Sequence, residues 1–121
     1  MKKILIVDDS ESIREIVSMT LINEGYDVLA GVDGVDAMDI ANKHDDIKLV
    51  ITDLHMPNMD GISLIKKLRV SEKYARVPIL FLTTETQVDK KLEAKQSGAT
   101  GWIIKPFIQR KLAMAVKKVI K

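Results

Sequence analysis

Carboxylates follow two of the apolar runs in this sequence at the point where each run ends. Asp8 and Asp9 come directly after Ile4–Val7, and Asp53 comes directly after Leu49–Thr52. Two charges about 4 Å apart repel each other by roughly 4 kcal/mol at an effective dielectric near 20. A sequence that keeps Asp8 and Asp9 side by side after a buried strand therefore needs something that offsets this repulsion.

Other polar residues end apolar runs in the same way. Thr83 and Thr84 follow Ile79–Leu82, and Lys105 follows Trp102–Ile104. Taken alone, an Asp after a strand is more often a helix cap, and a Lys there is usually solvated. Carboxylates, a hydroxyl and an ammonium together, however, suit a divalent cation and an anion, because Mg²⁺ takes one or two carboxylates and is completed by phosphate oxygens. The set predicts that Mg²⁺ offsets the repulsion.

The apolar periodicity supplies the elements that must position these side chains. Strand-like runs alternate with helical patterns along the whole chain. The runs are Ile4–Val7, Tyr26–Ala30, Leu49–Thr52, Ile79–Leu82 and Trp102–Ile104, and the helical patterns cover Ile13–Leu21, Ala37–Ala41, Ile62–Leu68, Val88–Leu92 and Leu112–Val119. Continuous apolar strands that are each followed by a helix predict a parallel α/β sheet with both faces covered. In such sheets ligands bind beyond the carboxyl ends of the strands, where the polar residues fall.

Composition excludes several classes of protein. The chain has 121 residues, which suits one domain, and it has no cysteine for a disulfide, a thiolate nucleophile or a cysteine zinc site. A net charge of +2 and a single tryptophan give no reason to expect binding to nucleic acid. No apolar run is long enough for a signal peptide or a membrane span. We therefore expect a cytoplasmic protein without a membrane or nucleic-acid partner.

Four motifs narrow the interpretation further. The strings ILIVDDS, TDLHMPNMDG, LTT and IIKPF occur in this order, and the whole chain resembles the receiver domains of two-component response regulators, most closely the free-standing CheY-like chemotaxis type. The resemblance implies a flavodoxin-like doubly wound sheet of five parallel strands in the order 2-1-3-4-5, with five helices on both faces. It also implies a single receiver domain over residues 1–121 with no output domain. Such a receiver domain catalyses only its own phosphorylation and dephosphorylation and is otherwise not an enzyme.

The same resemblance assigns the metal and the phosphoacceptor. It implies that a histidine kinase phosphorylates Asp53. Mg²⁺ would be held by Asp8, Asp9, Asp53 and the backbone carbonyl of His55. A carboxylate can attack phosphorus when nearby positive charge neutralises the incoming phosphoryl group.

Further positions match residues that complete the switch in this family. By the resemblance, Thr83 meets a phosphoryl oxygen and Lys105 pairs with the phosphate, presented by a cis peptide bond before Pro106. Trp102 stands at the aromatic position whose rotamer follows activation. His55 and Glu85 stand at the positions that flank the phosphoryl group and tune its hydrolysis, so a pair between them could gate the attacking water.

The distribution of charge suggests a docking face. Basic residues gather on the last two predicted helices, and they are Lys90, Lys91, Lys95, Arg110, Lys111, Lys117, Lys118 and Lys121. They favour an acidic, helical segment of a partner, such as a flagellar motor switch protein, on the face formed by the fourth helix, fifth strand and fifth helix. We expect a monomer that receives its phosphoryl group from a histidine kinase and that a phosphatase could reset.

Other functions stay open at this point. A phosphorelay intermediate would carry the same site and pass the phosphoryl group to another protein. A haloacid-dehalogenase-like phosphatase also forms an aspartyl phosphate with Mg²⁺, but its pattern places an acid two residues after the nucleophile, where this chain has His55. A flavodoxin-like nucleotide binder needs a phosphate-cradling loop after the first strand, whereas the string DDSE repels phosphate unless a metal intervenes.

Overall fold

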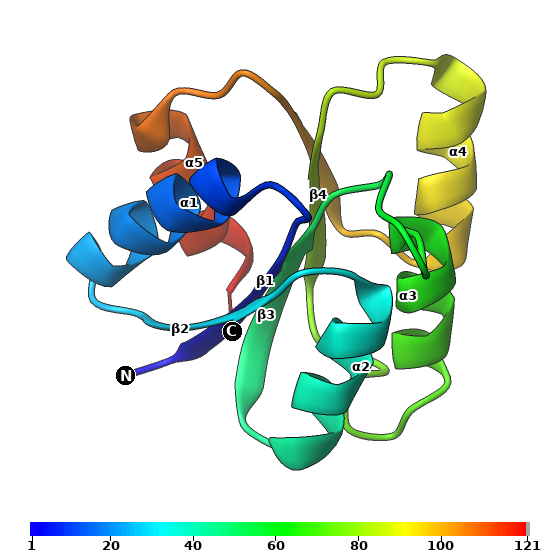
Figure 1. Ribbon diagram of the computed structural model, residues 1–121, viewed down its shortest axis with the longest axis horizontal. Helices are drawn as coiled ribbons and strands as arrows, with labels where there is room; N and C mark the ends of the chain where they lie inside the picture. The colour runs from blue at the N-terminus through cyan, green and yellow to red at the C-terminus, as the bar shows by residue number, and fades with distance from the viewer. Residues whose placement is uncertain (121) are drawn as a thin grey trace.

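A computed structural model describes residues 1–120, so Lys121 of the predicted basic face lies outside the described residues. Strands and helices alternate strictly along the chain (Figure 1). The elements are β1 (Lys3–Val7), α1 (Glu11–Asn23), β2 (Asp27–Gly31), α2 (Gly34–Lys43), β3 (Ile47–Thr52), α3 (Gly61–Arg69), β4 (Ile79–Thr83), α4 (Val88–Ser97), β5 (Gly101–Ile104) and α5 (Gln109–Val119). Every strand and helix predicted from the periodicity is present, with ends that differ by a few residues.

The strands form one parallel sheet in the order β2-β1-β3-β4-β5, which confirms the predicted doubly wound topology. Val7 pairs with Thr52 across β1 and β3, and Thr83 pairs with Ile104 across β4 and β5. Because the last residues of neighbouring strands are in register, the residues that follow them emerge at one edge. This register brings Asp8, Asp53 and Lys105 toward one another.

Helices cover both faces of the sheet, and each face has its own apolar core. Figure 1 shows α1 and α5 on one side of the sheet and α2, α3 and α4 on the other. Strand β1 supplies both cores alternately, since Leu5 and Val7 pack toward α2 and α3 while Ile4 and Ile6 pack toward α1 and α5. All of Ile4–Val7 is at most 1% exposed, as a strand buried on both faces requires.

Local hydrogen bonds fix where the helices begin and end. Side chains of Ser10, Asp33 and Asp60 cap α1, α2 and α3, and each accepts a hydrogen bond from a backbone N–H in the first turn. Helix α4 has no side-chain cap at its N-terminus and buries only Ala94. Its C-terminal end is held firmly, because the Arg69 guanidinium donates to the Gly98 carbonyl at 2.8 and 3.1 Å. The end of α4 that lacks a side-chain cap is therefore its N-terminal end, which follows Thr83 in the chain.

Among the residues that the structure describes, no helix has the length and apolar character that a membrane crossing requires.

Candidate functional site

One ammonium group joins two carboxylates at the carboxyl edge of the sheet. Lys105 Nζ donates to Asp8 Oδ2 at 2.6 Å and to Asp53 Oδ2 at 3.0 Å. The side chains of Lys105, Asp8 and Asp53 are only 11%, 3% and 12% exposed. Three strand ends that are far apart in sequence therefore meet in one partly buried ionic cluster, as the positions of these residues after β1, β3 and β5 predicted.

Asp9 completes a group of acids that could hold a metal ion. Carboxylate oxygens of Asp8, Asp9 and Asp53 all lie within 4.8 Å of one another. Asp8 is buried and Asp9 is exposed, so the two adjacent carboxylates approach this space from different depths. Hard oxygen ligands gathered in this way suit Mg²⁺, which also keeps several of its waters. The donor set therefore fits the predicted cation.

The turn between β1 and α1 fixes the Asp8 carboxylate and its backbone. Asp8 Oδ1 accepts from the Ser10 backbone N–H at 2.9 Å, and Arg14 donates to the Asp8 carbonyl at 2.8 Å. The Asp8 backbone N–H donates to the Gly31 carbonyl at 3.2 Å, which continues the pairing of β1 with β2. The turn therefore fixes Oδ1 of this carboxylate, while Oδ2 has Lys105 as its partner.

Burial and pairing shift the pKa of the two central groups. Burial raises the pKa of Asp8, because the hydrogen bonds from Lys105 and from the Ser10 N–H offset only part of the cost of desolvating the carboxylate. Burial alone would lower the pKa of Lys105, but the bonds to both Asp8 and Asp53 outweigh it and raise that pKa. Because one ammonium is shared by two carboxylates, the cluster has a net negative charge. The cluster can therefore bind a cation.

The loop after β3 orients the Asp53 carboxylate. Asp53 Oδ1 accepts from the Leu54 backbone N–H at 2.7 Å and from the His55 N–H at 3.4 Å, while Oδ2 faces Lys105. The Asp53 N–H itself donates to the Val7 carbonyl at 2.9 Å. Both carboxylate oxygens are thus directed, one toward the loop backbone and one toward the cluster.

Thr83 and Glu85 border the same edge from β4. Thr83 is fully buried, and its hydroxyl oxygen accepts from the Glu85 backbone N–H at 3.2 Å. Glu85 Oε1 lies 2.8 Å from His55 Nε2, and its other oxygen accepts from the Thr86 and Gln87 N–H groups. These bonds, the one from His55 first, lower the pKa of Glu85. A His55–Glu85 pair therefore spans the loops after β3 and β4.

Trp102 lies in β5, and its ring is near a lysine of α4. Its ring packs against Phe81 with centroids 5.6 Å apart, and Lys91 Nζ lies 5.7 Å from the ring centroid. The indole Nε1 is buried without a hydrogen-bond acceptor. Three residues further on, the Lys105–Pro106 peptide bond is cis.

Sequence reasoning missed two residues that touch the site region. Arg14, which holds the Asp8 carbonyl, carried no signal beyond its place on the first helix. Asn58 donates to Asp33 Oδ2 at 2.6 Å and was not singled out within the string MPNMDG. The only hint in the sequence was the residue type, since Asn tolerates the left-handed conformation that Asn58 adopts, with φ of 67°.

Comparisons with known proteins agree with this geometry. The family model described as response regulator receiver domain matches residues 4–117. A chemotaxis protein CheY homolog of Campylobacter jejuni is 40% identical over 98% of this chain and 92% of its own length. Chemotaxis protein CheY1 of Helicobacter pylori is 37% identical over 98% of this chain and 96% of its own. The solved structure of Vibrio cholerae chemotaxis protein CheY4 superposes with a TM-score of 0.95 at 44% identity and covers 99% of both chains.

These matches confirm the resemblance drawn from the four motifs and the expectation that the chain is not a conventional enzyme. They also leave the phosphatase and nucleotide-binding alternatives without support, since the receiver-domain model matches residues 4–117.

Asp9→Asn tests whether the acids repel one another. The substitution removes an exposed charge from the group and should raise the free energy of unfolding in EDTA and low salt by about 0.5–1 kcal/mol. Thermal and urea unfolding measure this change, and Glu11→Gln, also in the β1–α1 region, is the control. Millimolar Mg²⁺ should stabilise Asp9→Asn less than wild type, because binding to the folded state adds more stability when the affinity is higher. A destabilised Asp9→Asn protein in EDTA would contradict the repulsion.

Proposed function

We propose that this chain, which belongs to the response regulator receiver domain family, is a phosphorylation-activated switch whose phosphoacceptor is Asp53. The observation that carries the proposal is the placement of the Asp53 carboxylate, whose side chain is 12% exposed and whose Oδ2 lies 3.0 Å from Lys105 Nζ. It combines a directed nucleophilic oxygen with a fixed positive charge beside it. Family membership supports a histidine kinase as the source of the phosphoryl group.

Four groups of this chain are suited to hold Mg²⁺. We assign the carboxylates of Asp8, Asp9 and Asp53, whose oxygens lie within 4.8 Å of one another, and the backbone carbonyl of His55. When bound, the ion would neutralise charge on the phosphoryl oxygens. Asp8 also keeps Lys105 in place, because its 2.6 Å bond is the shorter of the two that the ammonium makes.

Phosphoryl transfer follows from this arrangement. Asp53 Oδ attacks phosphorus, and the O–P bond to aspartate forms as the N–P bond of the kinase phosphohistidine breaks. The imidazole, which carries a proton on its other ring nitrogen, takes the electron pair of that bond and leaves as a neutral ring. Lys105 moves its hydrogen bond from the Asp53 carboxylate to a phosphoryl oxygen. The Leu54 N–H, now 2.7 Å from Asp53 Oδ1, keeps the acyl group oriented.

Thr83 and Trp102 are the residues we assign to switching. The Thr83 oxygen accepts from Glu85 N–H, so its hydroxyl hydrogen is free to donate to a phosphoryl oxygen. Such a bond would draw the end of β4 toward Asp53 and shift residues 84–87, beyond which α4 begins without a side-chain cap. The buried indole N–H of Trp102 has no acceptor, which favours a ring able to take a second position.

We assign the control of phosphoryl lifetime to His55 and Glu85. The two side chains meet at 2.8 Å across the loops after β3 and β4, and His55 is 60% exposed whereas Glu85 is 13% exposed. A pair in this position can restrict the approach of water to the acyl phosphate. Its effect would be on the rate of hydrolysis rather than on phosphoryl transfer.

The docking face is proposed on α4, β5 and α5. Exposed Val88 and Leu92 lie in a groove with Trp102, and Lys91 and Lys95 lie along the same groove. An amphipathic, acidic segment of a partner matches this mixture of apolar surface and positive charge. Because similar proteins are named chemotaxis proteins, we propose a flagellar motor switch protein as that partner, with a phosphorelay protein as the alternative. We also propose that the chain acts as a single receiver domain, since the match spans nearly the whole length of these relatives, and that it does so as a monomer.

Phosphorylation of Asp53 is tested directly with small phosphodonors. Wild-type protein incubated with Mg²⁺ and phosphoramidate should gain one phosphoryl group, and borohydride reduction followed by peptide mass spectrometry should locate it at Asp53. Asp53→Asn should gain none, while Asp60→Asn, an acid at the cap of α3 in the same loop, should be labelled like wild type. Stoichiometric labelling of Asp53→Asn would refute the assignment.

Trp102, the only tryptophan, reports the switch. Beryllofluoride with Mg²⁺ should change its emission and lower its quenching by acrylamide, because the ring would move into space that Thr83 vacates. Thr83→Ala should weaken this response without preventing phosphorylation, and Asp53→Asn should abolish it. Equal quenching of the free and beryllofluoride-bound wild type would exclude an inward movement of Trp102.

A further inference from the structure

The loop between β3 and α3 is hydrogen-bonded to the N-terminus of α2, a helix that contributes no residue to the site. It runs from Asp53 to Asp60 and contains His55. Near its far end, Asn58 Nδ2 donates to Asp33 Oδ2 at 2.6 Å, although the two residues are 25 positions apart. Asp33 lies at the N-terminus of α2, beside the edge of the sheet that β2 forms.

Asp33 uses both of its carboxylate oxygens. Oδ1 accepts from the Asp36 backbone N–H at 2.8 Å and caps α2, while Oδ2 holds Asn58. The residue is only 7% exposed. These bonds, the one from the Asp36 N–H first and the one from Asn58 second, lower the pKa of Asp33. The carboxylate is therefore ionised and acts as a fixed acceptor between the helix and the loop.

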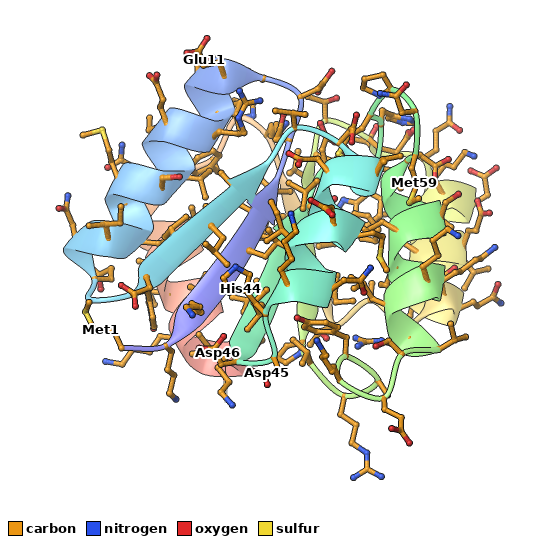
Figure 2. All side chains as sticks on the ribbon, turned by 60° about the horizontal axis from the view of Figure 1, so that its bottom comes forward. Met1, Glu11, His44, Asp45, Asp46 and Met59 are labelled. Carbon is orange, nitrogen blue, oxygen red and sulfur yellow. The ribbon has the colours of Figure 1, made fainter. Side chains whose placement is uncertain are left out.

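A second contact secures the same junction. The Gly34 backbone N–H donates to the Met59 carbonyl at 3.2 Å. A Cβ at Gly34 would lie 2.7 Å from the Cβ, Cγ and carbonyl oxygen of Met59, so only glycine lets the backbone of α2 approach this closely. Figure 2 shows Met59 at the N-terminal end of α3, beside α2.

The backbone of the loop needs such an external contact. Asn58 has φ of 67°, and it is the one residue other than glycine with positive φ among residues 1–120. An Asn tolerates this conformation better than most residues, but it persists only where the surroundings fix it. Two bonds hold it here: the Met59 N–H donates to the Pro57 carbonyl at 2.7 Å within the loop, and the side-chain bond to Asp33 holds Asn58 from outside the loop.

We propose that Asp33 is a positioning residue for the metal and phosphoacceptor site, acting through Asn58 to hold the loop that presents the His55 carbonyl and the Asp53 carboxylate. This inference rests on the proposed function, because it is that function which gives the His55 carbonyl a metal to bind. The alternative is that the contact only stabilises the fold. The two differ in what they predict for metal affinity in folded protein.

Asn58→Asp separates these two roles. It places a second carboxylate against Asp33, so the junction opens through repulsion, while the new side chain still tolerates positive φ. If the junction positions the loop, the affinity for Mg²⁺ measured by calorimetry should fall about tenfold, as is typical when a residue supporting a metal ligand is lost. If the added negative charge acted only by attracting the cation from a distance, Asn58→Asp would instead bind Mg²⁺ more tightly than wild type. Asn42→Asp, which adds the same charge near the other end of α2, is the control and should keep wild-type affinity.

The swapped variant Asp33→Asn/Asn58→Asp should restore binding. The amide that replaces the carboxylate of Asp33 can still cap α2 through its oxygen, and its NH₂ group can donate to the carboxylate that replaces the amide of Asn58. The junction then re-forms with its donor and acceptor exchanged. Recovery to nearly the wild-type affinity for Mg²⁺ is expected.

Hydrogen exchange in EDTA provides a readout that needs no metal. Asn58→Gly accepts the positive φ without strain but deletes the side-chain bond. The amides of residues 54–56, 58 and 59 should exchange faster in Asn58→Gly and Asn58→Asp than in wild type and the swapped variant. Wild-type Mg²⁺ affinity in both single variants would overturn the inference, and faster exchange beside it would show that the contact only orders the loop. Wild-type protein that binds no Mg²⁺ at all would instead count against the proposed function, and the exchange data would still decide whether Asp33 orders the loop.

Discussion

The bond that Lys105 shares between Asp8 and Asp53 is the interaction on which the site depends. It joins the residues that follow β1, β3 and β5, and the Lys105 backbone N–H also donates to the Thr83 carbonyl of β4 at 2.8 Å. Four strand ends are thus connected through one residue. Because a buried carboxylate is costly without a partner, removing this ammonium would disturb the edge of the sheet as well as its chemistry.

The same bond explains why the site can act as a switch. One ammonium does not balance the carboxylates of Asp8, Asp9 and Asp53, so the cluster has capacity for a cation and, with it, a phosphoryl group. Each loop around the cluster is tied differently. The β3–α3 loop is fastened by Asp33, whereas the segment after Thr83 leads into the uncapped end of α4. A charge added at Asp53 would therefore move the second loop more readily than the first.

Much of this arrangement could be predicted from the sequence because it depends on strand ends. The continuous run Ile4–Val7 indicated a strand buried on both faces, and parallel register then placed Asp8, Asp53 and Lys105 at one edge. Contacts between side chains far apart in sequence could not be predicted. Periodicity does not distinguish the burial of Asp8 from the exposure of Asp9, and the Asp33–Asn58 bond joins side chains 25 positions apart in the sequence.

A double-mutant cycle on Asp8 and Lys105 tests the central claim most directly. Urea unfolding in EDTA would be measured for wild type, Lys105→Met, Asp8→Asn and the double variant. Lys105→Met should cost about 3 kcal/mol, because it leaves the 3% exposed Asp8 carboxylate without its ammonium. Asp8→Asn in that background should recover a large part of the loss, with a coupling free energy above about 1.5 kcal/mol. Costs that add to within about 0.5 kcal/mol would show that the two residues do not depend on each other, which would contradict the account.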